Sequence, residues 1–343
     1  MKLGNLFGIL NFKKIFFIST VAAICFGLWP ACSAYAGETD EKMPPMPKGY
    51  ENDEEVKTAI LTGKVKLIDA INVKVPDSVV EEKGIEYGKV GDRSLQLDLY
   101  RPMAIKKPVP GLIFIHGGGW KGGSREVMKY YTVRYAERGY VTATISYRFS
   151  QEAPFPAAVS DAKCAVRWMR ENAKKHRIDP EKIGIIGGSA GAHLAMMTGY
   201  SSDVPELEGE GGHAGVSSRV QAVLEFYGPT DLTTEFARKQ SVAREFLSGK
   251  SYEEAPDLYV LASPISHLTK NDPPTLILHG TIDTIVPIAQ ADKLAEKLTE
   301  LGIAHVYEKF EGWPHTMDLA EAVNQRCQYR MNEFLDKYLP LPK

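Results

Sequence analysis

The segment GGSAG at residues 187–191 fits the pattern G-x-S-x-G and places the hydroxyl of Ser189 in a tight turn. It follows an apolar run at residues 183–186 and opens a helical pattern at residues 190–200. This strand–turn–helix context is typical of a nucleophile elbow, in which small neighbours leave room for a strained serine. The amino terminus of the helix also stabilises the negative charge that develops on the substrate during acyl transfer. We therefore predict that Ser189 is a nucleophile rather than a spectator in a glycine-rich turn.

A second glycine-rich segment, HGGGW at residues 116–120, directly follows the apolar run 112–115. Consecutive glycines allow backbone N–H groups to turn into a site with no side chains in the way, and such loops supply oxyanion donors beside a nucleophile elbow. We predict an oxyanion hole formed by the N–H groups of Gly118, Gly119 and Ala190. We interpret His116 as a structural residue that braces this loop.

A base and an acid must follow the serine in the order Ser, Asp or Glu, His. Asp283 comes just after the apolar run 275–278, and His315 comes just after the run 305–310. Both therefore lie on loops at the carboxyl ends of predicted strands. We predict that His315 accepts the proton of Ser189, and that Asp283 orients the imidazole and stabilises its protonated form.

Other polar or aromatic residues near these motifs are weaker candidates for a role in the site. Asp231 also follows a strand and is the alternative acid, although a helix N-cap is the preferred interpretation. We interpret His193 and His279 as structural residues. Trp120 and Trp313 flank the oxyanion loop and the base, where either one lines the substrate pocket or packs in the core.

The elements that position these loops are predicted to be strands that alternate with helices. A hairpin is predicted at 85–99, with helical patterns at Ala157–Lys174 and Ala289–Leu301 among later elements. The strands are almost continuously apolar, as parallel strands buried on both faces must be. They are predicted at Gly111–Ile115, Val141–Ser146, Ile183–Gly187, Val220–Phe226, Thr275–Leu278 and His305–Phe310. This pattern indicates an α/β fold with a mostly parallel, doubly wound sheet, whose ligands bind at the strands' carboxyl ends.

Composition is that of a globular protein: 44% of the 343 residues are hydrophobic and 24% are charged. The net charge of -2, with both signs interspersed, does not favour nucleic acid or an anionic membrane as a partner. The histidines and cysteines lack metal-ligand spacing, and no phosphate-binding glycine loop is present. We expect chemistry without a metal or a cofactor.

The first 36 residues have the pattern of a secretory signal peptide. Lys13 and Lys14 precede the apolar run Ile15–Trp29, and the small residues at 34–36 form an A-x-A site. This run is shorter than the roughly 20 residues of a spanning helix, and the residues before Cys32 fit a lipobox poorly. We expect export, to the periplasm or the medium, with cleavage after Ala36 and no membrane anchor in the mature chain.

The mature chain is predicted to have three parts. Residues 37–50 read as an extended proline-rich linker, residues 51–80 as a mixed segment with a short helix near 54–61, and residues 81–343 as the catalytic domain. The longest irregular insertions, 201–219 and 233–268, are expected to set substrate choice, and the second is expected to form a short cap.

Two further side-chain pairs give structural predictions. Cys164 and Cys327 fall in helices that cover opposite faces of the predicted sheet, so we expect two separate buried thiols rather than a disulfide. Asp161 and Arg148 are expected to form an ion pair.

Taken together, these motifs resemble those of secreted bacterial esterases of the α/β-hydrolase superfamily, near the hormone-sensitive-lipase-like group. The most similar subgroup contains bifunctional acetyl and feruloyl carbohydrate esterases (BD-FAE-like). The resemblance covers about residue 87 to the carboxyl end and includes LDLYRP (97–102), HGGGW, GSAGAH (188–193), YGPTD (227–231) and HGTIDTIVP (279–287). The chain departs from the usual patterns at Gly188, at Ala192 and in the WPHT segment (313–316).

The resemblance implies a serine esterase that acts on short acyl esters, with acetyl or feruloyl groups of plant polysaccharides among its substrates. Its partner is then a small-molecule or oligosaccharide ester. The alternatives are a general carboxylesterase, a formamidase-type amidase, and a non-catalytic binding protein of the same fold. The sequence leaves the oligomeric state open.

Overall fold

The computed structural model describes residues 42–343, and the predicted signal peptide lies outside the described residues. Its centre is one sheet in the order β1-β2-β4-β3-β5-β6-β7-β8. The eight strands are β1 (Val79–Val90), β2 (Arg93–Pro102), β3 (Val109–Ile115), β4 (Val141–Ile145), β5 (Ile178–Gly188), β6 (Ala222–Phe226), β7 (Thr275–Gly280) and β8 (His305–Phe310).

Strands β4, β3, β5, β6, β7 and β8 are parallel to one another, whereas β1 and β2 form an antiparallel hairpin that pairs with β4. Helices cover both faces of the sheet, so strands β3, β4, β6 and β7 are buried along their whole length. The carboxyl ends of the parallel strands lie along the same edge of the sheet, so the loops that follow β3, β5, β7 and β8 converge there.

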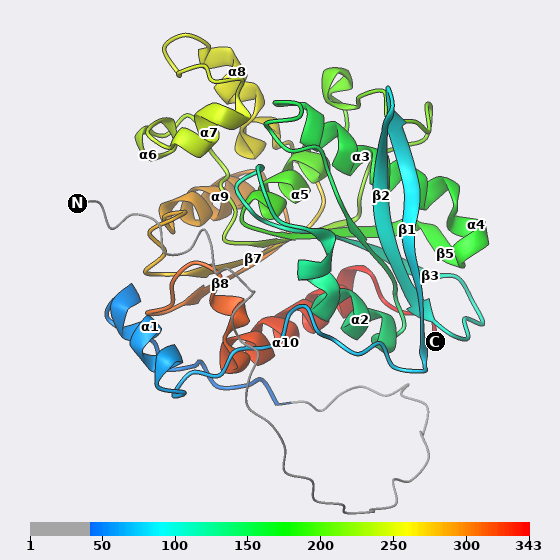
Figure 1. Ribbon diagram of the computed structural model, residues 1–343, viewed down its shortest axis with the longest axis horizontal. Coiled ribbons are helices and arrows are strands. Elements are labelled where there is room, and N and C mark those ends of the chain that lie inside the picture. Colours follow the sequence, from blue (N-terminus) through cyan, green and yellow to red (C-terminus); the bar gives the residue numbers. More distant parts are fainter. Residues whose placement is uncertain (1–41) are drawn as a thin grey trace, which may run out of the picture. The chain divides into compact units, whose positions relative to one another are not determined.

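Helices lie on both faces of the sheet (Figure 1). The ten α-helices among the described residues are α1 (Asp53–Leu61), α2 (Lys129–Arg138), α3 (Ala157–Glu171), α4 (Ala173–His176), α5 (Ala190–Tyr200), α6 (Glu235–Arg238), α7 (Ser241–Phe246), α8 (Pro256–Leu261), α9 (Ala289–Glu300) and α10 (Glu321–Tyr338). Helices α3, α5 and α9 pack on one face and share one hydrophobic cluster with it. Helices α2 and α10 cover the other face and form a second cluster.

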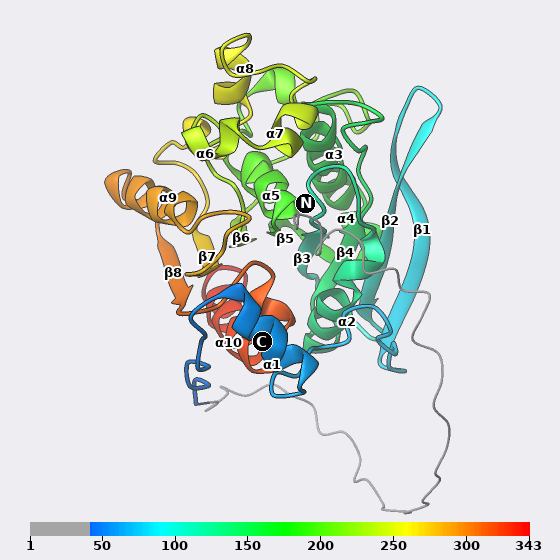
Figure 2. The ribbon, with the colours of Figure 1, turned by 60° about the vertical axis from the view of Figure 1, so that its left-hand side comes forward.

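The predicted fold class is confirmed, with differences at the element boundaries. Strand β5 begins at Ile178, five residues earlier than predicted, because Ile178 pairs with Val109. The predicted helix 157–174 is two helices, since α3 ends at the cap residue Asn172 and α4 follows. Helices α6, α7 and α8 occupy the predicted cap region, and Figure 2 shows them together beyond α5.

Both predictions about side-chain pairs are confirmed. Cys164 on α3 and Cys327 on α10 are free and buried in different clusters. Arg148 and Asp161 form an ion pair in which guanidinium Nη2 lies 2.7 Å from carboxylate Oδ1. The Asp161 side chain is 1% exposed and also accepts the backbone N–H of Arg148.

Residues 42–80, which precede the predicted catalytic domain, pack directly on it. Val56 of α1 is buried in the same cluster as α10. The N–H of Ile68 donates to the carbonyl of Leu319, and Leu67 forms a bridge with Ala320. Within the described part of the chain, no helix has the length and apolar character needed to cross a bilayer.

The Arg148–Asp161 pair predicts a large stability effect. We expect Asp161→Ala to lower the free energy of unfolding by about 3–5 kcal/mol, because it leaves a poorly exposed guanidinium without its counter-ion. The matched control is Glu152→Ala, which breaks the exposed pair with Arg93 and is expected to cost at most about 1 kcal/mol. Urea denaturation of both variants measures the difference, and equal losses would contradict the prediction.

Candidate active site

The three residues predicted as a triad lie within hydrogen-bonding distance of one another. The Nε2 atom of His315 is 2.9 Å from the hydroxyl oxygen of Ser189. Its Nδ1 atom is 2.6 Å from Oδ2 of Asp283. Since a carboxylate only accepts, the Nδ1–H donates to Asp283, which leaves Nε2 free to accept the serine proton. The geometry is therefore the one that the predicted triad of nucleophile, base and orienting acid requires.

The serine occupies a strained turn between β5 and α5. Its backbone has φ 55° and ψ -123°, a combination that a non-glycine residue rarely adopts and that costs about 1–3 kcal/mol. A Cβ atom on Gly187 would lie 2.2 Å from the carbonyl oxygen of Gly191, and one on Gly191 would lie 2.1 Å from that of Ile115. Glycine is thus required on both sides of Ser189, as the motif predicts.

Asp283 is held in its ionised form by hydrogen bonds from three directions. Its Oδ1 accepts the N–H groups of Ile285 and Val286, both at 2.8 Å. Its Oδ2 accepts from His315 and lies 3.4 Å from Nε2 of His279. Burial acts to raise the pKa of Asp283, but the hydrogen bonds from His279 and His315 outweigh it and bring the pKa to about 2. A permanent negative charge therefore faces the imidazole of His315.

A tyrosine that the sequence analysis did not select packs against the base. The ring of Tyr227 lies 4.6 Å from the imidazole of His315, centroid to centroid. Its hydroxyl donates to Oδ1 of the buried Asp318 at 2.5 Å, and Tyr131 donates to the other carboxylate oxygen at 2.8 Å. Tyr227 directly follows strand β6, so the strand-end rule that selected the triad applies to it as well.

Tyr227 also accounts for one departure from the usual elbow motif. A Cβ atom on Gly188 would lie 3.2 Å from the Tyr227 hydroxyl oxygen, a tight contact, so the aspartate of the GDSAG form would require the tyrosine to shift slightly. The glycine at 188 therefore avoids a tight contact with the tyrosine that packs on His315.

The HGGGW loop passes directly beside the nucleophile. A Cβ atom on Gly117 would lie 3.1 Å from Cβ of Ser189, and Gly118 and Gly119 have φ values of 116° and 60°. The N–H of Ala190 belongs to the first turn of α5, which has no intrahelical acceptor. The structure thus brings the three predicted oxyanion donors to the loop and the helix turn that flank the serine.

His116 and His193 have structural surroundings. Burial lowers the pKa of each to about 4, so both are neutral near pH 7. His116 donates from Nδ1 to the carbonyl of Gly117 at 2.7 Å and stacks on Tyr147. His193 donates from Nε2 to the carbonyl of Ala262 at 2.8 Å and accepts from Trp120.

The two tryptophans considered for substrate binding are in the core. Trp120 is 4% exposed, stacks on Phe246 at 4.5 Å and donates to His193. Trp313 is 3% exposed and donates to the carbonyl of Pro47. The structure favours core packing for both, because so little of either indole is available to a substrate.

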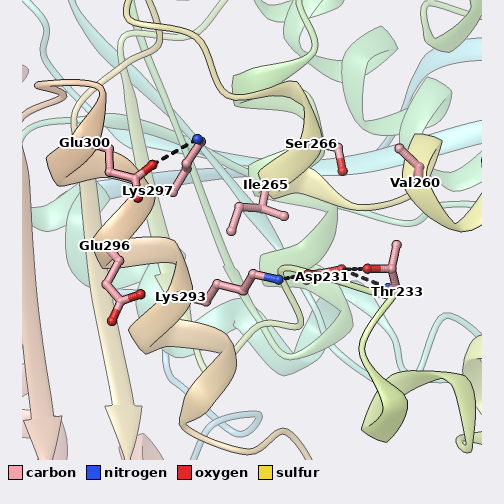
Figure 3. Close-up of a pocket in the computed structure, with 9 residues that line it drawn as sticks. All are labelled: Asp231, Thr233, Val260, Ile265, Ser266, Lys293, Glu296, Lys297 and Glu300. Carbon is pink, nitrogen blue, oxygen red and sulfur yellow. Dashed lines mark hydrogen bonds and ion pairs between the residues drawn. The ribbon is translucent and has the colours of Figure 1, made fainter.

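Asp231, the alternative acid, faces a different cavity. This cavity, of about 410 Å³, lies between α9 and the cap and is drawn in Figure 3. One oxygen of Asp231 pairs with Lys293 and the other accepts from Thr233. The preferred N-cap interpretation is also wrong, since Thr234 caps α6 with its own side chain. Asp231 lies three residues before this cap, where its carboxylate accepts the backbone N–H of Thr233.

The amino-terminal segment supports the loop of the base, which the sequence analysis did not foresee. The N–H of Tyr50 donates to the carbonyl of Gly312 at 2.9 Å, and the Tyr50 ring packs edge-on against Trp313. A Cβ atom on Gly49 would lie 1.9 Å from the carbonyl oxygen of Glu311, so the backbones of these two segments are in close contact. Proline-rich composition gave no signal for this contact, because composition carries no information about partners.

No group of three or more metal-ligating side chains is found between residues 42 and 343. The eight-stranded sheet, the strained serine between β5 and α5, and the acid and base after β7 and β8 together define an α/β-hydrolase.

Comparison with known proteins identifies the family. The BD-FAE model matches residues 97–298, more than half of the chain, and the chain belongs to this family of α/β-hydrolase esterases. Esterase LipQ of Mycobacterium tuberculosis is 34% identical over 249 residues, which are 71% of this chain and 58% of LipQ. The chain therefore spans about three-fifths of the length of such relatives.

Solved structures agree with this assignment. A truncated carbohydrate esterase from gut microbiota is 26% identical and has a TM-score of 0.69, covering 80% of this chain and 99% of that one. Esterase 2 of Thermogutta terrifontis, with propionate bound, is 30% identical and has a TM-score of 0.66. That match covers 78% of this chain and 97% of the esterase.

The contrast between the two aspartates gives a direct prediction. We expect Asp283→Asn to lower kcat by about 10⁴-fold, because an amide does not enforce the Nδ1–H tautomer of His315. Asp231→Asn is expected to leave kcat near the wild-type value, since Asp231 bonds to Lys293 and Thr233 instead. Steady-state hydrolysis of an aryl acetate by both variants measures this, and the reverse order of losses would assign the acid to Asp231.

Proposed function

We propose that this protein is a serine esterase that hydrolyses short acyl esters through an acyl-enzyme intermediate. The observation that carries the proposal is the pair of hydrogen bonds of His315, 2.9 Å to the Ser189 hydroxyl and 2.6 Å to Asp283. In this mechanism Ser189 attacks the ester carbonyl while Nε2 of His315 accepts its proton and passes it to the leaving alcohol. A water molecule, activated by the same nitrogen, then releases the acid.

The negative charge on the carbonyl oxygen needs donors that are already in place. We assign this role to the N–H groups of Gly118, Gly119 and Ala190. Each such donor is worth roughly 3–4 kcal/mol of transition-state stabilisation. The positive φ values of the two glycines and the position of Ala190 at the start of α5 support the assignment.

A preference for short acyl groups is supported by the cap. Val242 of α7 lies against the oxyanion loop: a Cβ atom on Gly119 would be 2.9 Å from its Cγ2. Phe246 of the same helix stacks on Trp120, and Lys121 pairs with Glu245. Helix α7 thus contacts the proposed oxyanion loop at three points. These contacts limit the space beside the loop that an acyl chain could occupy.

The substrate class that we propose is an acetyl or feruloyl ester of a polysaccharide. Membership of the BD-FAE family and the likeness to a carbohydrate esterase support it. Export is part of this proposal, because such polymers lie outside the cell; it is supported by the sequence pattern of residues 13–37.

The proposed function predicts acyl release that depends on Ser189. The full chain is expressed in a bacterial host, the amino-terminal residue of the recovered protein is determined, and the protein is assayed on acetylated xylo-oligosaccharides, methyl ferulate and aryl esters. We expect Gly37 as the first residue and acid release by the wild type, with loss of activity and an unchanged melting temperature in Ser189→Ala. Equal turnover by that variant would contradict the mechanism. Activity confined to aryl esters would contradict the polysaccharide substrate alone.

The position of Val242 predicts a change in acyl-length preference. We expect Val242→Ala to raise kcat/KM for an aryl octanoate relative to the acetate by roughly tenfold, because removal of two methyl groups opens space beside Gly119. Val260→Ala on α8 is the matched control, since Val260 is 44% exposed and lines the separate cavity near Asp231. An unchanged ratio for Val242→Ala would show that α7 does not limit the acyl group.

A further inference from the structure

A buried glutamate and a buried histidine lie behind the catalytic acid, and the mechanism above does not use them. Glu225 of β6 and His279 of β7 are both 0% exposed. One carboxylate oxygen of Glu225 accepts the N–H of Gly228 at 2.8 Å, while its Oε1 has no hydrogen-bond partner among residues 42–343. The Nδ1 atom of His279 likewise has none in this part of the chain. Each group therefore keeps one polar atom free inside the core.

The sheet register places the two side chains on the same face. Glu225 pairs with Ile277 in the parallel β6–β7 ladder, and His279 is two residues further along β7. Alternate residues of a strand point to the same side, so Glu225, Ile277 and His279 share the face covered by α5 and α9. An isolated charge in such a place is costly, and it is tolerated when an opposite charge lies beside it.

His279 reaches the catalytic acid with its other nitrogen. Its Nε2–H donates to the carbonyl of Val286 at 2.8 Å and lies 3.4 Å from Oδ2 of Asp283. That oxygen is the one that accepts the proton of His315. The imidazoles of His279 and His315 therefore approach one carboxylate oxygen from two directions.

The ionisation of these groups is coupled. Burial raises the pKa of Glu225 to about 7, against the opposing effects of His279 and the Gly228 N–H. Burial by itself lowers the pKa of His279, but the bond to Asp283 and the charge of Glu225 outweigh it, so the net shift is upward. The two groups are therefore coupled through their charges: the charge of Glu225 favours a proton on His279, and a proton on His279 favours the ionised form of Glu225.

Other titratable groups face this pair or the base. Near Glu225 and His279 they are Tyr200 of α5, Tyr307 of β8, and Asp292 of α9, whose own partner is Lys309. The Tyr200 hydroxyl is bonded to Thr275, and the Tyr307 hydroxyl donates to Asp292. Near His315 they are Tyr227, Asp318, Asp283 and the Ser189 hydroxyl.

We propose that His279 is a positioning residue of the triad, and that the buried carboxylate of Glu225 on the same face of the sheet stabilises its protonated form. The Nε2–H of His279 holds the same carboxylate oxygen of Asp283 that accepts the proton of His315. The charge of Glu225 offsets that of protonated His279, so that Asp283 presents a single negative charge to His315. This inference rests on the proposed function only for its kinetic test.

The kinetic test is the acidic midpoint of kcat/KM against pH, in wild type, His279→Gln, Glu225→Gln and the double variant. We expect His279→Gln to move the midpoint up by about one pH unit, since Asp283 then attracts the His315 proton without the opposing imidazole. Glu225→Gln is expected to move it up by less, because Nδ1 of His279 then loses its proton at lower pH and opposes the charge of Asp283 less strongly. In the His279→Gln background the glutamate is neutral, so adding Glu225→Gln should change nothing.

His176→Gln is the matched control, since His176 is also a buried histidine and lies on α4 beside Trp168. We expect its profile to coincide with that of the wild type. Coincident profiles of wild type, His279→Gln and Glu225→Gln would overturn the inference, as would an equal shift in His176→Gln. A purely structural role for His279 would lower the melting temperature without moving the midpoint.

A second measurement needs neither substrate nor the His279→Gln variant. The ¹⁵N signals of the His279 ring are followed against pH by NMR in the wild type and in the isosteric Glu225→Gln variant. We expect Nε2 to stay protonated in both and Nδ1 to lose its proton at lower pH in Glu225→Gln. An unchanged titration would overturn the inference even if the protein proved to hydrolyse esters. The expected change would support it even if the proposed substrate were wrong.

Discussion

The hydrogen bond between Nδ1 of His315 and Oδ2 of Asp283 is the constraint on which the rest of the site depends. It orients the imidazole, and the same ring must then meet the Ser189 hydroxyl with its other nitrogen. Each partner lies on a loop after a different strand, so small errors in sheet register or loop position would separate them. The parallel arrangement of β5, β7 and β8 solves this problem because it brings all three loops to one edge.

Positioning at this edge depends on strained backbone held by close packing. Ser189, Tyr227 and Thr316 all have positive φ values, although none is a glycine. Such conformations persist only where the surroundings determine them fully. Here Gly191 lies against the end of β3, and Gly312 lies against Tyr50 of the amino-terminal segment. A segment outside the matched family region thus supports the loop of the base, which links residues 47–50 to the geometry of the site.

Much of this organisation was predictable from the sequence, and the part that was not has a common cause. Ser189, Asp283 and His315 follow apolar strands directly, so local pattern and chain order were sufficient to select them. Tyr227, Asp318 and Tyr50 escaped selection because their importance comes from contacts between residues that are far apart in the chain. Asp231 had the same strand-end position as Asp283, and only the three-dimensional structure shows that its carboxylate pairs with Lys293 on α9. Strand position predicts which edge a residue occupies, whereas side-chain partners decide what it does there.

Two buried carboxyl groups near the site illustrate this dependence on side-chain partners. Asp318 lies with Tyr227 and Tyr131 in the layer under α10, while Glu225 lies with His279 in the layer under α5 and α9. Each cluster contacts one member of the acid–base pair: Tyr227 packs on His315, and His279 approaches Asp283. An unpaired carboxylate in either layer would be strongly unfavourable. Asp318 accepts from two tyrosine hydroxyls, and Glu225 accepts the N–H of Gly228 on the face of the sheet that it shares with His279. The hydrogen bond at the centre of the site is therefore supported from both faces of the sheet by polar groups that the hydrophobic core keeps from solvent.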